Sequence, residues 1–173
     1  MTLTREWLIQ AARFALFVLA QVLLARRLAL FDTGFCFVYI GFLLFLPIQL
    51  GRPWELLLAF ALGWTLDLFY DTGGIHAAAC ILVAFLRAGQ LRIIRPRDGY
   101  DAQDTVNGHR MGWTWWLLAT LPLVLIHHTA VFWIETGHIG LGFSVIVRIL
   151  ASALFTEFTL LIAQLLLWEP AAR

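Results

Sequence analysis

The sequence contains very little charge. Only 13% of its 173 residues are charged, and lysine is absent altogether, whereas a soluble protein carries about 25% charged residues. Hydrophobic residues make up 61% of the chain, and the mean hydropathy is +0.83. Too few polar side chains remain to cover a globule in water, so most of the surface must be solvated by lipid. The composition predicts a polytopic membrane protein.

Serine, asparagine and cysteine are also scarce. The chain holds two serines and one asparagine, which excludes long disordered tails. The two cysteines, Cys36 and Cys80, form no CxxC motif, no metal-ligand spacing and no disulfide framework. The net charge is +1 with no basic cluster, which argues against a nucleic-acid partner.

Apolar segments long enough for transmembrane helices recur along the whole chain. A helix needs about 20 mostly apolar residues to cross a bilayer core, and an open strand edge is not stable in lipid. Seven of the eight tryptophans lie at predicted helix ends, where amphipathic rings prefer the membrane interface. We therefore expect an all-α fold with a single transmembrane domain over residues 1–173. Its six helices are predicted at about 7–25, 35–50, 54–70, 75–94, 113–134 and 141–168.

The distribution of arginine predicts the orientation in the membrane. With the N-terminus inside, seven arginines face the cytoplasm and two, Arg26 and Arg27, face outward. Both termini are then cytoplasmic, and the polar segment 95–112 is a cytoplasmic loop. This loop is either a solvated topology determinant or a docking point for a cytoplasmic partner. The arginine pair also follows the first helix where a small-residue cleavage site would be needed, so that helix is expected to remain as an anchor.

Charged residues inside apolar segments are the main candidates for function, because each costs about 2.5–3.5 kcal/mol to insert. Asp67 and Asp71 are four residues apart on one helical face. Two acids on one helix turn cannot face each other across a substrate, so an aspartyl protease pair is not predicted. The last helix adds Arg148 and Glu157.

Two histidines, His127 and His128, lie in the fifth predicted helix. His128 and Glu135 share a helical face as two metal ligands would, but no HExxH motif or third ligand accompanies them. An interhelical hydrogen bond or ion pair is the other interpretation. The sequence therefore predicts no metal, no cofactor and no enzyme.

Depth in the membrane suggests a partner for Asp67. In the inferred orientation Asp67 and Arg148 lie about 6 Å and about 11 Å below the outer surface, and an arginine side chain can span that difference. His127 and His128 lie at a similar depth. We therefore expect an ion pair between Asp67 and Arg148. The alternative is that Asp67 caps the adjoining turn or meets water.

Small residues recur at helical spacing in the third and fourth helices. Ala59 and Gly63 form one such pair, and Cys80, Ala84 and Ala88 continue the spacing on the next helix. Small faces allow helices in lipid to approach closely. They either hold this bundle together or receive a helix from a partner.

These features together resemble the MreD family of bacterial rod shape-determining proteins. The resemblance is carried by the Gly63-x-x-x-Asp67 segment running on to Gly74, the stretch GIHAAACILVAFLR (74–87), the loop RPRDGY (95–100) and IHH (126–128) followed by Glu135. It implies a fold similar to that of the S components of energy-coupling-factor transporters.

The resemblance also implies a function and partners. Members are non-enzymatic subunits of the cell-elongation machinery in the bacterial inner membrane. They bind MreC and so link MreB filaments inside the cell with RodA and its transpeptidase. Structural or partner-binding roles then fall on Gly63, Asp67, Asp71, Gly74, His127, His128, Arg148 and Glu157. A small-molecule-binding transporter subunit is the alternative and would need a polar-lined pocket near the outer face; an intramembrane enzyme is the third hypothesis.

Overall fold

The computed structural model describes residues 3–25, 28–30, 33–137 and 142–167, and these are mostly helical. Helix α1 continues directly into the π-helix η1, and a two-stranded antiparallel hairpin precedes the remaining helices. The elements are α1 (Leu3–Leu19), η1 (Ala20–Leu24), β1 (Ala29–Leu30), β2 (Gly34–Phe35), α2 (Ile40–Leu44), α3 (Arg52–Tyr70), α4 (Ile75–Ile93), α5 (Gly108–Met111), α6 (Trp113–Thr136) and α7 (Phe143–Leu167).

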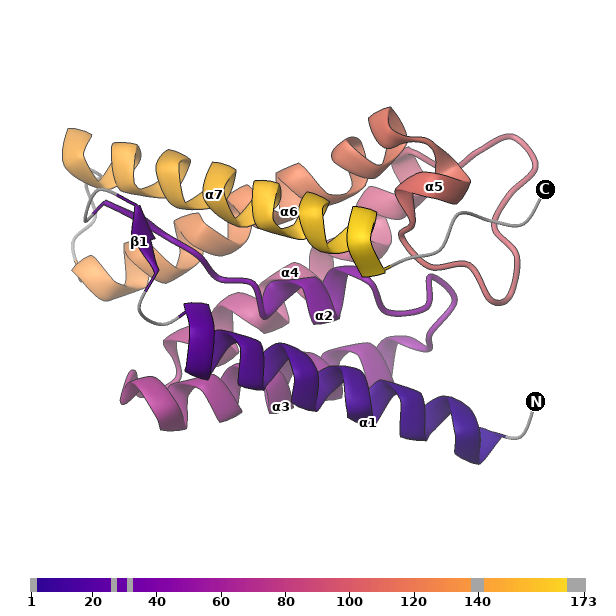
Figure 1. Cartoon of the computed structure of the whole chain (residues 1–173), viewed down its shortest axis with the longest axis horizontal. Coiled ribbons are helices and arrows are strands. Elements are labelled where there is room, and N and C mark those ends of the chain that lie inside the picture. The colour runs from indigo at the N-terminus through magenta and orange to yellow at the C-terminus, as the bar shows by residue number, and fades with distance from the viewer. Residues whose placement is uncertain (1–2, 26–27, 31–32, 138–141, 168–173) are drawn as a thin grey trace.

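The long helices lie side by side along one axis (Figure 1). Helices α6 and α7 form one side of the molecule, α1 and α3 the other, and α4 and α2 lie between them. One end of the molecule, the turn end, carries the β-hairpin and the short connection between α3 and α4. The opposite end, the loop end, carries the start of α1, the end of α7 and α5.

Four of the described helices are long and apolar enough to cross a membrane. They are Arg5–Leu24, α4, α6 and Phe143–Leu166 of α7. Helix α3 matches α4 in length but carries Arg52, Glu55 and Asp67, and it is not among the four. The coarse expectation of a mostly helical fold with several helices apolar enough to cross a membrane is confirmed.

The predicted boundaries of α3, α4 and α6 agree with the structure to within two residues. The first predicted helix begins earlier, at Leu3. Some predictions fall outside the described residues: the helix ends at 141 and 168, the outward-facing pair Arg26 and Arg27, Trp168 and Arg173.

The helix predicted over 35–50 is wrong. Only Ile40–Leu44 is α-helical; the chain before it is extended or turning, and turns follow it around Pro47. The segment is nevertheless deeply buried, since all residues from Tyr39 to Leu46 are buried and their hydrophobic side chains are at most 2% exposed. Non-helical backbone is tolerated at membrane depth only where protein surrounds it and satisfies its polar groups.

Helix α7 supplies part of that hydrogen bonding. The hydroxyl of Ser152 accepts from the N–H of Phe35 at 2.9 Å, and the hydroxyl of Thr156 accepts from the N–H of Phe37 at 2.9 Å. Both hydroxyl residues are fully buried. Two polar residues in an apolar helix are therefore explained by the extended chain that packs against them.

Arg87 of α4 satisfies the other end of the 35–50 segment. Its guanidinium donates to the carbonyls of Leu44 and Leu46 at 3.3 Å and 2.6 Å. The same group forms a salt bridge of 2.9 Å with Glu55 of α3, and both side chains are at most 3% exposed. One buried ion pair thus joins α3, α4 and the chain after α2.

Helices α3 and α4 pack closely through their small residues. A Cβ added to Gly63 would lie 2.4 Å from the Cα of Ala77, which is backbone and cannot move aside. Ala59, Cys80 and Ala84 are at most 1% exposed on the same faces. These small residues therefore help to hold the bundle together, as the first of the two interpretations predicted. Ala88, which continues the same spacing, is only partly buried.

The polar segment 95–112 is folded against the loop end. The main-chain carbonyl of Asp104 accepts from the N–H of Ile48 at 2.8 Å, and the buried carboxylate of Asp104 lies 3.0 Å from Arg110. The hydroxyl of Tyr100 donates to the carbonyl of Leu91 at 2.7 Å. Partial burial raises the pKa of this phenol, so it remains a donor. The segment is thus attached both to α4 and to the chain after α2.

Candidate functional site

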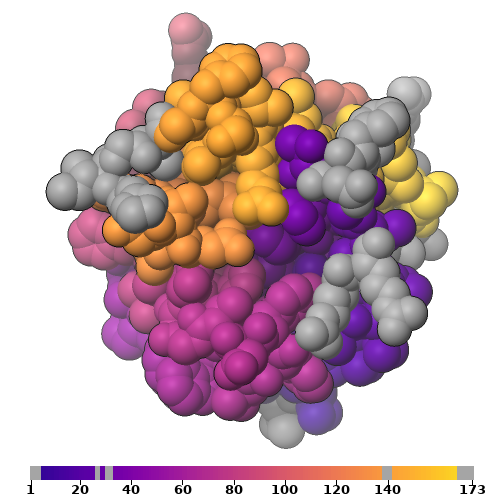
Figure 2. Space-filling view, turned by 90° about the vertical axis from the view of Figure 1, so that its left-hand side faces the viewer, coloured from indigo at the N-terminus to yellow at the C-terminus, as the bar shows by residue number. Residues whose placement is uncertain are grey.

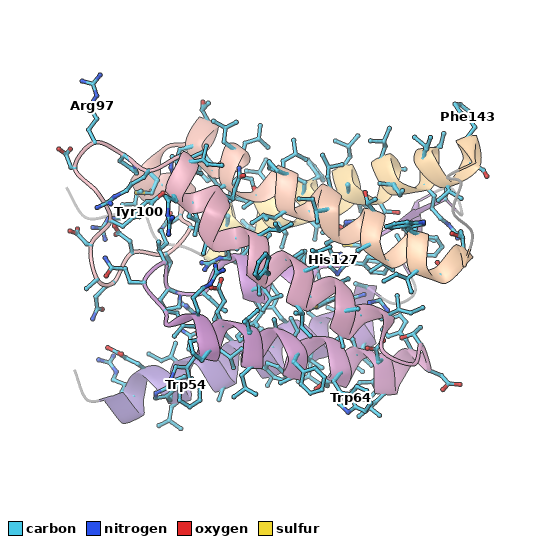
Figure 3. All side chains as sticks on the ribbon, turned by 180° about the vertical axis from the view of Figure 1, so that it is seen from behind. Trp54, Trp64, Arg97, Tyr100, His127 and Phe143 are labelled. Atoms are coloured by element: carbon cyan, nitrogen blue, oxygen red, sulfur yellow. The ribbon has the colours of Figure 1, made fainter. Side chains whose placement is uncertain are left out.

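The candidate site is a cluster of buried polar side chains from four elements. Its members, which we call the buried polar cluster, are Tyr39, Asp67, His76, His127 and His128, and each is at most 4% exposed. Asp67 lies on α3, His76 on α4 and the other two histidines on α6. Tyr39 comes from the non-helical chain just before α2. Figure 3 places His127 in the middle of the molecule.

Asp67 caps the N-terminus of α4. One carboxylate oxygen accepts from the hydroxyl of Thr72 and, at 3.0 Å, from the N–H of His76; the other accepts from the N–H of Ala77 at 2.9 Å. The residue at the usual capping position is Gly74, which has no side chain to offer and a φ of 106°. An acid from α3 therefore satisfies the free N–H groups of the first turn and faces the positive end of the helix dipole.

The predicted ion pair between Asp67 and Arg148 is wrong. Arg148 lies 4.0 Å from Glu135 of α6, and its guanidinium sits over the rings of Phe35 and Phe132 at 4.9 Å and 5.3 Å. The depth argument fixes the height of each residue along the bundle but not the side that it faces. The alternative prediction, that Asp67 caps the adjoining turn, is confirmed.

Tyr39 bridges two histidines. Its hydroxyl lies 2.6 Å from Nδ1 of His76 and 2.7 Å from Nε2 of His127. A phenol has a single proton, so Tyr39 donates to one ring and accepts from the other. The tautomers of the two imidazoles are therefore coupled through the tyrosine, and the three groups tie α4, α6 and the 35–50 segment together.

His128 holds the extended chain through Thr156. Its Nδ1 donates to the carbonyl of Val124 at 2.8 Å, which leaves Nε2 as the acceptor for the Thr156 hydroxyl at 3.1 Å. That hydroxyl can then accept from the N–H of Phe37. The ring of Phe37 stacks on the His128 ring with centroids 5.2 Å apart. His128 thus orients the group that satisfies the 35–50 backbone.

The remaining predicted site residues lie outside this cluster. Asp71 is exposed and ends α3 in the left-handed conformation, with φ 57°. Glu157 is buried between α7 and α6, where one carboxylate oxygen meets the hydroxyl of Thr120. Its other oxygen has no hydrogen-bond partner among the described residues. The structure thus brings Asp67, His127 and His128 into one cluster. In the described part of the chain, Asp71, Arg148 and Glu157 form no hydrogen bond with the members of that cluster.

A pocket of about 240 Å³ adjoins the cluster at the turn end. In Figure 2, which looks onto this end, the segment joining α3 and α4 meets α6 and α7. Aromatic rings of Phe35, Phe37 and Phe132 and the polar groups of His76 and Arg148 are part of the pocket lining. The pocket therefore offers both stacking surfaces and charge to a small ligand. Within the described ranges, no three His, Cys, Asp or Glu residues group closely enough to hold a metal ion.

Comparison of the chain with protein-family models, with curated proteins and with solved structures finds no match. The functional argument therefore depends on the residues and geometry described above.

Two members of the buried polar cluster were not singled out from the sequence. Tyr39 lies inside an apolar run, where a tyrosine is equally typical of a membrane-interface position. His76 follows the Gly73–Gly74 turn and looks like part of an exposed connection. One signal was available: each carries a polar group within a predicted apolar segment, where a buried partner is required.

Proposed function

We propose that this chain is a non-enzymatic scaffold subunit of the bacterial cell-elongation complex, of the MreD type. In this role it binds MreC in the inner membrane and supports peptidoglycan synthesis and cell shape. The proposal rests on the sequence resemblance, and one structural observation supports it best. Asp67, the acid of the resembling Gly63-x-x-x-Asp67 segment, is the group that joins α3 to the start of α4.

Several buried polar residues support a scaffold because they bond to other parts of the same chain. The histidines of α6 hold Tyr39 and Thr156, and Arg87 holds Glu55 and the chain after α2. Such bonds fix the helices relative to one another, so that the outward faces keep constant positions. A protein that aligns partners on two sides of a membrane needs this rigidity.

Complex formation tests the scaffold proposal directly. We expect the protein to co-purify with MreC from membranes in mild detergent, and depletion in a rod-shaped host to give round or swollen cells. The variants Asp67→Ala and Asp71→Asn form a matched pair, because only the first removes a buried cap. Compared at equal expression level, only Asp67→Ala should impair the complex. Normal cell shape after clean deletion in a rod-shaped host would refute the proposal.

We also propose six membrane crossings with both termini in the cytoplasm. The 35–50 segment, which is helical only in α2, then forms one crossing enclosed by the other helices, and the loop end faces the cytoplasm. A reporter that is active only outside the cytoplasm should be silent when fused after Arg173 or within 98–108. It should be active when fused after Gly73 or Gly137. Activity within 98–108 would reverse the orientation.

The pocket at the turn end favours one second candidate, a small-molecule-binding subunit of a transporter. In the proposed orientation this pocket faces outward, and Arg148 and Glu135 contribute charge to its lining. Native mass spectrometry of the purified protein distinguishes the two functions. A small compound that is retained by the wild type and lost in Arg148→Gln supports transport, whereas a consistently empty protein that binds MreC supports the scaffold.

A further inference from the structure

A basic hollow lies at the loop end, where the start of α3 meets the last turns of α4. It has a volume of about 540 Å³, and its lining includes Arg52, Phe85, Ala88, Gly89 and Arg92. A second hollow of about 360 Å³ shares Ala88 and Arg92 with it. We call the larger one the basic hollow; the rest of its lining is Ile48, Leu50, Glu55 and Leu86.

Small residues on one face of α4 create the basic hollow. Phe85, Ala88, Gly89 and Arg92 follow the spacing that places side chains on the same helical face. A Cβ added to Gly89 would meet nothing within 4 Å, so close packing does not require a glycine there. This contrasts with Gly63, where a Cβ would strike the backbone of Ala77. The face between Phe85 and Arg92 is therefore open space rather than a helix contact.

The basic hollow carries excess positive charge. Its lining includes one acid, Glu55, which is 3% exposed and already paired with Arg87 at 2.9 Å. Arg52 is held over the hollow, because it donates to the carbonyl of Phe85 at 3.3 Å and lies 5.3 Å from the ring of that residue. Within the part of the chain that the structure describes, Arg92 forms no ion pair. Guanidinium groups with free N–H donors are suited to phosphate oxygens.

The surroundings of the basic hollow are those of a membrane interface. Phe85 is 56% exposed, and Trp54, two residues after Arg52, is 51% exposed. Figure 3 places Trp54 and Tyr100 at the same end of the molecule. Exposed tryptophan is typical of the headgroup level of a bilayer, with the apolar helix surface extending into the core. A ligand that fits this arrangement has a phosphate at the arginines and hydrocarbon along the helices.

We propose that the basic hollow binds the headgroup phosphate of an anionic phospholipid. Arg52 and Arg92 contact the phosphate, Gly89 and Ala88 leave room for it, and the acyl chains lie along the exposed faces of α3 and α4. A zwitterionic lipid carries its own cation, which the two arginines repel, so the site discriminates by net charge. This site is independent of the scaffold function.

Lipid binding to the purified full-length protein tests the proposal. Phosphatidylglycerol and phosphatidylcholine with identical acyl chains are added to the protein in detergent, and bound lipid is counted by native mass spectrometry. We expect phosphatidylglycerol to be retained in preference to phosphatidylcholine and to raise the thermal unfolding midpoint. The double variant Arg52→Gln/Arg92→Gln should bind phosphatidylglycerol at least about tenfold more weakly, because it loses two charge-assisted contacts.

Two further variants separate a built site from general attraction of charge. Gly89→Leu fills the basic hollow and leaves every arginine in place, and the space at this position means that the variant should fold. It should lose phosphatidylglycerol as the double variant does. Arg97→Gln removes an exposed arginine that does not line the hollow and should bind like the wild type.

Several results would overturn the proposal. Wild-type binding of phosphatidylglycerol by both Gly89→Leu and the double variant would show that the lipid binds elsewhere. An equal loss in Arg97→Gln would indicate a diffuse electrostatic effect. An equal thermal shift from inorganic phosphate alone would show that the site takes free phosphate rather than lipid.

Discussion

Replacing Arg87 by methionine is expected to lower the free energy of unfolding in detergent by about 3–5 kcal/mol, because it leaves a buried charge without its partner. Glu55 loses its salt bridge of 2.9 Å in an environment where it is 3% exposed. The carbonyls of Leu44 and Leu46 lose their donor at the same time. Chemical unfolding followed by tryptophan fluorescence measures the change.

Two further variants serve as controls for Arg87→Met. Arg97→Met removes an exposed arginine of the loop and should change the free energy of unfolding very little. Adding Glu55→Leu to Arg87→Met removes both charges and should recover part of the loss. Recovery should be incomplete, since the two carbonyls after α2 remain without a donor. An Arg87→Met protein as stable as Arg97→Met would contradict the assigned role of this ion pair.

Replacing Asp67 by alanine is also expected to lower the free energy of unfolding by about 3–5 kcal/mol. The reason is that hydrogen bonds to a charged acceptor contribute about 1.5–3 kcal/mol each. The variant leaves the N–H groups of His76 and Ala77 unsatisfied and the Thr72 hydroxyl without its acceptor. Thermal unfolding in detergent and protease sensitivity near the α3–α4 turn should both report the loss.

The neighbouring acid provides the control for Asp67. Asp67→Asn replaces one acceptor oxygen by a donor that faces an N–H group, so it should remain clearly destabilised. Asp71→Asn alters an exposed residue in a left-handed conformation that asparagine tolerates, so it should be nearly neutral. The swap of Asp67→Arg with Arg148→Asp should recover nothing, because the two residues have different partners. Recovery of stability in that double variant would support the ion pair between Asp67 and Arg148 and contradict the capping role of Asp67.

Composition and apolar run length predicted the long helices well. The boundaries of α3, α4 and α6 follow from where apolar residues give way to Gly, Pro and charged residues. The close packing of α3 on α4 followed from the spacing of Ala59 and Gly63, since only small residues fit such a contact. These features depend on neighbours along the chain, which the sequence shows directly.

The 35–50 segment could not be predicted in the same way. Its apolar composition suits a helix as well as a buried extended chain, and Pro47 was the only local sign of irregular structure. The groups that satisfy its non-helical backbone lie far away in the sequence: Ser152 bonds to the extended chain before α2, and Arg87 bonds to the chain after it. The choice between the two conformations is made by tertiary contacts.

The candidate site was predicted in part for a similar reason. Asp67, His127 and His128 stood out because polar groups in lipid need partners, and each has one. The identity of the partner depends on rotation about the bundle axis, which depth along a helix does not determine. Backbone N–H groups at the start of α4 were also stronger competitors for Asp67 than a flexible arginine from α7.

The extended chain before α2 has a consequence for biogenesis. Its N–H groups at Phe35 and Phe37 bond to hydroxyls 117 and 119 positions later in the sequence. If this stretch crosses the membrane as proposed, its acceptors do not yet exist while the ribosome is still synthesising α6, and hydrocarbon offers these two N–H groups no other partner. The early segment can therefore reach its final position in the membrane only after α7 has been synthesised. Nascent chains that end before α7 should be preferred substrates for membrane proteases and for chaperones of the insertion machinery.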